Sequence, residues 1–145
     1  MYLADTNILI RFLLRNDPAY QPIRRAVTLL KTRRERIVTS AQNMVEFWRT
    51  CTQPLDRNGL ALSIEATEHR LRLLERHFPV LPEERQTYSE WKILVSKYRV
   101  MGKQVHDAHI VAAMAAHGVT QILTSNVRDF ARYDEITAFA PDDIV

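Results

Sequence analysis

The sequence has almost no cysteine and no long apolar segment. Cys51 is the only cysteine, so the chain cannot form an internal disulfide bond, and the cytoplasm is the expected location. No apolar run approaches the roughly 20 residues that a membrane-spanning helix needs, so we expect no membrane partner. We also expect no signal peptide, because Asp5 interrupts the first apolar run and no charged segment precedes it.

A strong excess of one charge is missing as well. Lys and Arg number 20 and Asp and Glu number 17, which gives a formal net charge of +3. Such a small excess is what an ordinary solvated surface carries. If several carboxylates gather at one site, however, the remaining surface is more basic, and a basic surface around an acidic site suits a polyanionic substrate.

Internal repeats, low-complexity tracts and linkers are also absent, so we expect the 145 residues to form one domain, 1–145, with its own core. Strands are predicted by the short apolar segments near residues 2–5, 37–38, 121–124 and 136–140. Amphipathic segments between them predict helices, including a helical pair at about 60–99. This alternation predicts an α/β fold: a doubly wound, mainly parallel sheet of four or five short strands with helices on both faces.

Helical spacing predicts which side chains face the core. The predicted core residues are Ile23, Ala26, Val27 and Leu30 in a helix over about 19–34, Met44, Phe47, Trp48 and Cys51 in a helix ending near Thr52, and Tyr88, Trp91, Val95 and Tyr98 in a helix over about 83–99. The aromatic residues of the last set are interpreted as core or dimer contacts. The proline-flanked segment Phe78–Pro82 is expected to be extended and to provide a short edge strand.

The first stretch of the chain places an acid where a strand ends. A short apolar run leads directly into Asp5, and Thr6 and Asn7 are residue types that begin helices, because their side-chain oxygens accept hydrogen bonds from free backbone N–H groups. Asp5 is therefore expected at the carboxyl end of a buried strand. In open α/β sheets, ligands bind at that edge.

Three further acids occupy equivalent positions. Glu46 follows the second predicted strand, Asp107 opens an Ala-rich helix, and Asp129 lies in the first turn of the helix after Thr124. If the strands are parallel, the four acids converge at one edge, where they repel one another unless a cation is bound. Hard oxygen ligands select Mg²⁺ or Mn²⁺, and one or two such ions could activate water and stabilise the developing charge of a phosphodiester.

Each acid also has a purely structural interpretation. Asp5 can be a cap, Glu46 can pair with Arg49 at i+3, and Asp107 can be a helix N-cap. The segment Asn126–Asp129 can be a capping box in which Asp replaces Glu or Gln. No single acid makes the case for a site; the case depends on the four sharing one edge.

Four motifs follow one another in an order that resembles a known family. They are Asp5-Thr6-Asn7, Val45-Glu46, His106-Asp107-Ala108-His109-Ile110-Val111-Ala112 and Thr124-Ser125-Asn126-Val127-Arg128-Asp129-Phe130. This ordered set, which spans nearly the whole chain, resembles PIN-domain ribonucleases, especially VapC-type toxins. The resemblance implies a PIN-like fold, Mg²⁺- or Mn²⁺-dependent hydrolysis of RNA and a homodimer. For toxin members it also implies inhibition by a cognate antitoxin.

The resemblance also assigns roles to individual residues. The acidic quartet, which binds the metal and is catalytic, corresponds to Asp5, Glu46, Asp107 and Asp129, and the polar groups around it correspond to Thr6, Asn7, Thr124 and Asn126. One departure matters, because many relatives have an Asp at the position of Asn126. If that acid is the important fourth ligand, this chain holds metal less strongly.

Cationic residues near the predicted edge are less specific signals. Arg99, Lys103 and Arg128 are candidate contacts to RNA phosphates, with ordinary solvated charge as the alternative. His106 and His109 flank Asp107, but two histidines at i, i+3 without a cysteine are a weak zinc signal. We expect these histidines to contact solvent, RNA or the core.

Other functions compete with a nuclease. A module of the same fold with little catalysis could bind RNA or protein, and the Asn126 departure favours it. A phospho-acceptor of the response-regulator type is disfavoured, because no Lys follows Leu123. A haloacid-dehalogenase-type phosphatase is also disfavoured, because Asp5-Thr6-Asn7 lacks a second Asp two residues after the first.

Overall fold

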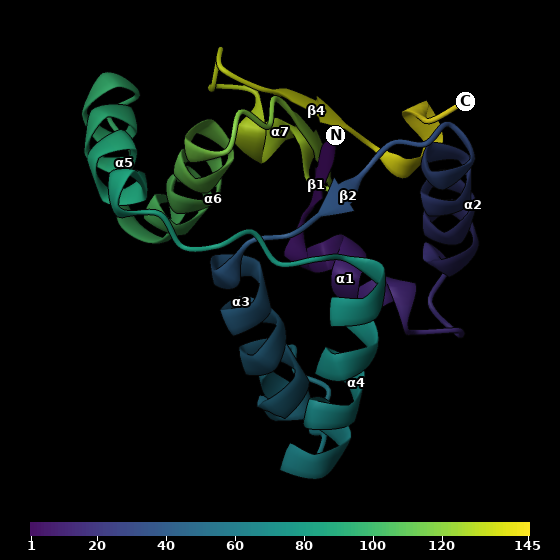
Figure 1. Ribbon diagram of the computed structural model, residues 1–145. Helices are drawn as coiled ribbons and strands as arrows, with labels where there is room; N and C mark the ends of the chain where they lie inside the picture. Colours follow the sequence, from purple (N-terminus) through teal and green to yellow (C-terminus); the bar gives the residue numbers. More distant parts are fainter.

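The computed structural model describes residues 1–145 and is built on one parallel sheet (Figure 1). Its strands are β1 (Tyr2–Ala4), β2 (Ile37–Val38), β3 (Gln121–Leu123) and β4 (Thr137–Phe139). Their order in the sheet is β2-β1-β3-β4, and every neighbouring pair is parallel. The predicted doubly wound parallel sheet is therefore confirmed.

Helices cover both faces of this sheet. They are α1 (Thr6–Phe12), α2 (Tyr20–Thr32), α3 (Ala41–Thr52), α4 (Ile64–His77), α5 (Arg85–Lys97), α6 (Val105–Ala116) and α7 (Val127–Phe130), with short 3-10 turns η1 (Leu55–Arg57), η2 (Gly102–Gln104) and η3 (Pro141–Asp143). One buried cluster gathers side chains of α1 to α4, and a second gathers those of α5 to α7. Figure 1 shows α5 and α6 on one side of the strands and α1 and α2 on the other.

Alternation along the strands divides the core between these two clusters. Leu3 and Ile122 belong to the cluster under α5 and α6, whereas Ala4 and Leu123 belong to the other. Successive side chains of a strand point to opposite faces, so a strand buried on both faces is apolar throughout. This is why the strands appear in the sequence as short continuous apolar runs.

A fifth strand is reduced to a single bridge at the edge of the sheet. The backbone N–H of Thr39 donates to the carbonyl of Pro79 at 3.0 Å, and the N–H of Leu81 donates to the carbonyl of Thr39 at 2.8 Å. These bonds pair Thr39 with Val80 in parallel. The extended segment Phe78–Pro82 thus follows β2, and it connects two helices that pack elsewhere: α4 beside α3, and α5 beside α6 (Figure 1).

Several local predictions differ from the structure. Of the predicted stripe on α5, Trp91, Val95 and Tyr98 are partly buried and pack against the core, whereas Tyr88 is 63% exposed, and the fully buried apolar side chain of this helix is Leu94. Trp48 is only partly buried. Residues 102–104 form η2 and α6 begins at Val105, so Asp107, which was predicted to open this helix, lies inside its first turn. No helix has the length and apolar character needed to cross a membrane.

Candidate functional site

Asp5 is fixed by the backbone at the carboxyl end of β1. Its N–H donates to the carbonyl of Leu123 at 3.0 Å, and its side chain caps α1 by accepting from the N–H of Thr6 at 2.7 Å. Only 6% of the residue is exposed. The cap interpretation is therefore confirmed, and it does not exclude the site interpretation, because one carboxylate oxygen caps the helix while the residue lies at the carboxyl edge of the sheet.

Both oxygens of the Asp5 carboxylate accept two hydrogen bonds each. Oδ1 accepts from Thr6 N–H and from Asn43 Nδ2, the latter at 3.2 Å. Oδ2 accepts from Asn7 Nδ2 at 2.8 Å and from Thr124 Oγ1 at 2.7 Å. An ionised carboxylate offers about four lone-pair sites, so the group is fully satisfied by the protein.

Burial nevertheless dominates the ionisation of Asp5. Desolvation raises its pKa to about 6, although the bonds from Thr124, Thr6 and Asn7 act in the opposite direction. The nearby charge of Glu46 adds to the increase. The protein has therefore placed a carboxylate where ionisation is costly, and where a bound cation would favour the charged form.

Glu46 is held in α3 by two side chains. Its Oε2 accepts from Thr6 Oγ1 at 2.8 Å, and its Oε1 accepts from Gln42 Nε2 at 3.0 Å. It forms no ion pair with Arg49, so the structural interpretation of Glu46 as a partner of Arg49 is wrong. Thr6 thus connects Glu46 to the network around Asp5.

Sequence reasoning missed Asn43, the buried centre of this network. Its Nδ2 donates to Asp5 Oδ1 and, at 3.1 Å, to Thr6 Oγ1. Its Oδ1 accepts from Ser40 Oγ at 2.6 Å and from Ser40 N–H at 3.3 Å, and the Asn43 N–H donates to Ser40 Oγ at 3.3 Å; the two backbone bonds form a capping box at the start of α3. The signal was available: Ser40 and Asn43 have capping-box spacing, and Asn43 precedes Glu46 by three residues, so both lie on one side of the helix.

Asp107 and Asp129 approach the same edge from the other side of the sheet. Asp107 lies in the first turn of α6, where it caps nothing, because the N-cap residue is Gln104. Burial raises the pKa of Asp107 to about 7, and the charges of Asp5, Glu46 and Asp129 add to the increase. The four acids therefore act on one another electrostatically.

A cavity of about 320 Å³ lies among three of the four acids, Glu46, Asp107 and Asp129. It is lined by Glu46, Arg49, Lys103, Gln104, His106, Asp107 and Asp129. No three of the acids are close enough in this conformation to bind one metal ion together. The donor set nonetheless fits Mg²⁺ or Mn²⁺, because it consists of hard carboxylate oxygens whose mutual repulsion a cation would relieve.

The sequence matches the family profile of the PIN domain over residues 2–136. The chain belongs to the PIN domain family. The resemblance that the four motifs indicated is thus confirmed.

Solved structures support the same fold. The chain is similar to VapBC2 from Rickettsia felis bound to a promoter DNA fragment (15% identity, TM-score 0.72, covering 96% of this chain and 97% of that one). It is also similar to VapBC-1 from nontypeable Haemophilus influenzae (18%, TM-score 0.70, 97% and 98%) and to a toxin-antitoxin complex from Klebsiella pneumoniae (20%, TM-score 0.66, 97% and 98%). A search of curated proteins found no match.

Three of the four predicted polar residues meet at Asp5 in this PIN domain. Thr6, Asn7 and Thr124 all donate to Asp5 or Glu46. Asn126 does not, because it is exposed and its bonds are made by the backbone: its N–H donates to Thr124 Oγ1 at 3.0 Å, and its carbonyl accepts from Asp129 N–H at 3.0 Å. Its side chain does not cap α7 either, so the capping-box interpretation of Asn126–Asp129 is wrong.

The cationic candidates separate into different places. Lys103 lines the acid cavity, and Arg128 lines a neighbouring hollow with Asn126 and Asp129. Arg99 lines neither of these cavities. Arg49 is a candidate that sequence reasoning missed: it lines the acid cavity and also an adjacent one that contains Arg57.

Proposed function

We propose that this PIN domain is a metal-dependent endoribonuclease that hydrolyses RNA phosphodiester bonds and acts as the toxin of a type II toxin–antitoxin pair. The observation that carries the proposal is the convergence of acids from β1, α3, α6 and α7 at one sheet edge, where Asp5 and Asp107 both have a raised pKa. Structural capping explains only one of these acids, Asp5, and leaves the convergence unexplained.

In this proposal the metal is Mg²⁺ or Mn²⁺, held by Asp5, Glu46, Asp107 and Asp129. Such an ion, when bound, lowers the pKa of water and stabilises charge that develops on a phosphate. The protein itself orients the first two acids, since Asn43 and Thr6 hold Asp5 while Thr6 and Gln42 hold Glu46. Lys103, Arg128 and Arg49 are proposed to contact the phosphates of RNA.

The proposed partners follow from the family and its solved members. Similar chains occur in VapBC and other toxin-antitoxin complexes, which supports a cognate antitoxin for this chain. We propose that the protein works as a homodimer in the cytoplasm and that residues 1–145 form one domain. One cooperative unfolding transition and a dimer mass in light scattering are the expected measurements.

The decisive experiment is incubation of the purified protein with total RNA, with and without Mn²⁺, beside Asp5→Asn. We expect metal-dependent fragments from the wild-type protein, and no fragments from the folded variant, because the amide removes a metal-binding charge. Circular dichroism checks that the variant keeps its fold. Full cleavage by Asp5→Asn would contradict the assignment of the site.

A second candidate is a PIN-fold module that binds RNA or protein with little catalysis. The saturated Asp5 carboxylate favours it, because a metal must share or displace one of four hydrogen bonds. This candidate requires RNA retention that does not depend on Mn²⁺ and a melting temperature that Mn²⁺ does not raise. Absence of metal-dependent fragments together with these results would select it.

A further inference from the structure

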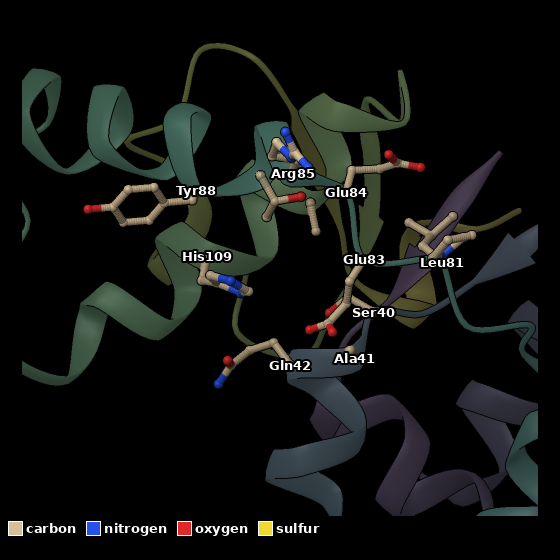
Figure 2. A pocket seen from close by; sticks show the side chains of 12 residues that line it. Ser40, Ala41, Gln42, Leu81, Glu83, Glu84, Arg85, Tyr88 and His109 are labelled. Carbon is tan, nitrogen blue, oxygen red and sulfur yellow. The ribbon is translucent and has the colours of Figure 1, made fainter.

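The sheet edge at which Asp5, Glu46, Asp107 and Asp129 gather is called the acid edge. A second cavity lies beside it and shares no lining residue with the acid cavity. It has a volume of about 280 Å³ and lies between the start of α3, the segment before α5, and α6 (Figure 2). The polar residues that matter below are Gln42, Glu83 and His109, and the floor includes Ala113. Pockets for small ligands begin at roughly 300 Å³, so the space suits one planar heterocycle rather than a large ligand.

His109 is the unexplained group in this cavity. Its Nδ1 is buried and has no hydrogen-bond partner, the only buried side-chain nitrogen or oxygen in the chain left in that state. An unpaired buried polar atom typically costs about 1–3 kcal/mol, so such atoms call for an explanation. A ligand that supplies a donor or acceptor to His109 Nδ1 would remove this cost, provided that the groups that cover this atom move aside when the ligand binds.

The remaining polar groups indicate the kind of ligand. Figure 2 shows Glu83 and His109 turned toward the same space, whereas Glu84 points away from it. A carboxylate in the wall repels a phosphate but accepts hydrogen bonds from amino groups. Adenine, cytosine and guanine carry exocyclic amino groups, and uracil does not.

Gln42 connects this cavity to the acids. It lines the cavity, and its Nε2 donates to Glu46 Oε1 at 3.0 Å. His109 lies on α6, two residues after Asp107. A nucleotide whose phosphate lies at the acid edge can therefore reach this cavity with a neighbouring base.

We infer that the cavity binds one amino-bearing nucleobase of the RNA substrate, adjacent to the phosphate that is cleaved. Proteins that recognise single-stranded RNA read unstacked bases by hydrogen bonds to their edges. Glu83 accepts from the exocyclic amino group, and His109 Nδ1 bonds a ring nitrogen or a carbonyl oxygen. This inference depends on the proposed nuclease function only for its position next to the cleaved phosphate.

The binding step is tested without cleavage. Adenosine, cytidine, guanosine and uridine are titrated separately into metal-free Asp5→Asn protein, and the imidazole signals of His109 are followed by NMR. We expect saturable shifts with at least one amino-bearing nucleoside, and a response to uridine at least fivefold weaker. No response to any nucleoside, or an equal response to uridine, would overturn the inference even if the protein proves to be a nuclease.

The cleavage step uses an RNA pool with random bases around the cut. We expect His109→Leu and Glu83→Gln to reduce the preference for an amino-bearing base beside the cut by at least threefold. Glu84→Gln is the matched control, with the same charge change on a side chain that points away, and should keep the wild-type preference. Equal effects of Glu83→Gln and Glu84→Gln would contradict the inference.

The cavity could instead be filled by a side chain of a second protein copy, and light scattering distinguishes this occupant from a nucleobase. If His109→Leu or Glu83→Gln converts a dimer to a monomer, the cavity is an interface between copies and the inference is wrong. An unchanged mass together with the lost base preference supports it. If wild-type protein gives no metal-dependent fragments while nucleosides still bind, the nuclease proposal fails and the base site stands.

Discussion

The acid edge has two halves that the protein treats differently. On the side of β1 and α3, all four oxygens of Asp5 and Glu46 accept hydrogen bonds from named side-chain or backbone donors. On the side of α6 and α7, the carboxylates of Asp107 and Asp129 form no ion pair and cap no helix. We call the first the held half and the second the free half, because the carboxylates of Asp107 and Asp129 lack such partners.

The free energy needed to ionise a carboxyl group also differs between the two halves. For Asp5, burial is partly offset by hydrogen bonds, and the pKa is about 6. For Asp107, burial and three neighbouring acids act in the same direction, and the pKa reaches about 7. In the proposed metal site, the held half would provide a fixed position for a cation, and the free half would carry the repulsion that the cation relieves.

The largest effect is expected from breaking the held half. Asn43→Ala leaves Asp5 Oδ1 and Thr6 Oγ1 short of a donor and removes the capping partner of Ser40. We expect a loss of about 1–3 kcal/mol of folding free energy, measured by urea unfolding, and a drop of about 10–100-fold in RNA cleavage. A loss of folding stability with an unchanged rate of RNA cleavage would show that Asn43 supports the fold and not the proposed active site.

A substitution in the free half should raise the folding stability instead of lowering it. Between the ordinary pKa of Asp, about 4, and about 7, the folded protein binds a proton at Asp107 that the unfolded chain has lost. The stability that this raised pKa provides is complete below pH 4 and is lost as the pH rises through 7. Asp107→Asn should therefore be more stable than wild type by roughly 1–2 kcal/mol at pH 8, and nearly equal to it at pH 4.

Two further measurements sharpen this result. Asp56→Asn, an exposed carboxylate in η1, is the matched control and should show no pH-dependent gain. Mn²⁺ should raise the melting temperature of wild type more than that of Asp107→Asn, because the ion offsets the repulsion that the variant has already lost. A gain at pH 4 as large as at pH 8 would mean that repulsion among the acids is not the cause.

The two halves also differ in how far the sequence predicted them. Asp5, Thr6 and Asn7 were placed correctly, because an apolar run followed by capping residues marks a strand end locally. The role of Asn43 depends on its contact with Asp5, 38 residues earlier in the chain, and no local sequence pattern reports such a contact. The start of α6 was set two residues late, because η2 leads into the helix without a capping side chain.

The helix α5 shows the same limit on the other face. The spacing of Tyr88, Trp91, Val95 and Tyr98 is helical, and the last three do pack against the core around α6, but spacing alone does not say how deeply each side chain is buried. Leu94 is buried and Tyr88 is exposed, so the larger aromatic ring is outside and the aliphatic side chain is inside. The alternation of strands and helices in the sequence predicted that the strands are parallel, but it did not predict which strands are neighbours in the sheet.

The smallest effect is expected from the cations around the free half. In the Asp5→Asn background, which is expected not to cut RNA, Lys103→Ala should weaken RNA binding a few-fold and reduce the slope of log Kd against log salt by about 0.7 to 1, because one phosphate contact is lost. Arg99→Ala removes the same charge from a residue that lines neither cavity at the acid edge, and should change neither quantity. Equal losses in the two variants would mean that RNA is attracted by the overall charge of the surface, and that Lys103 has no contact of its own.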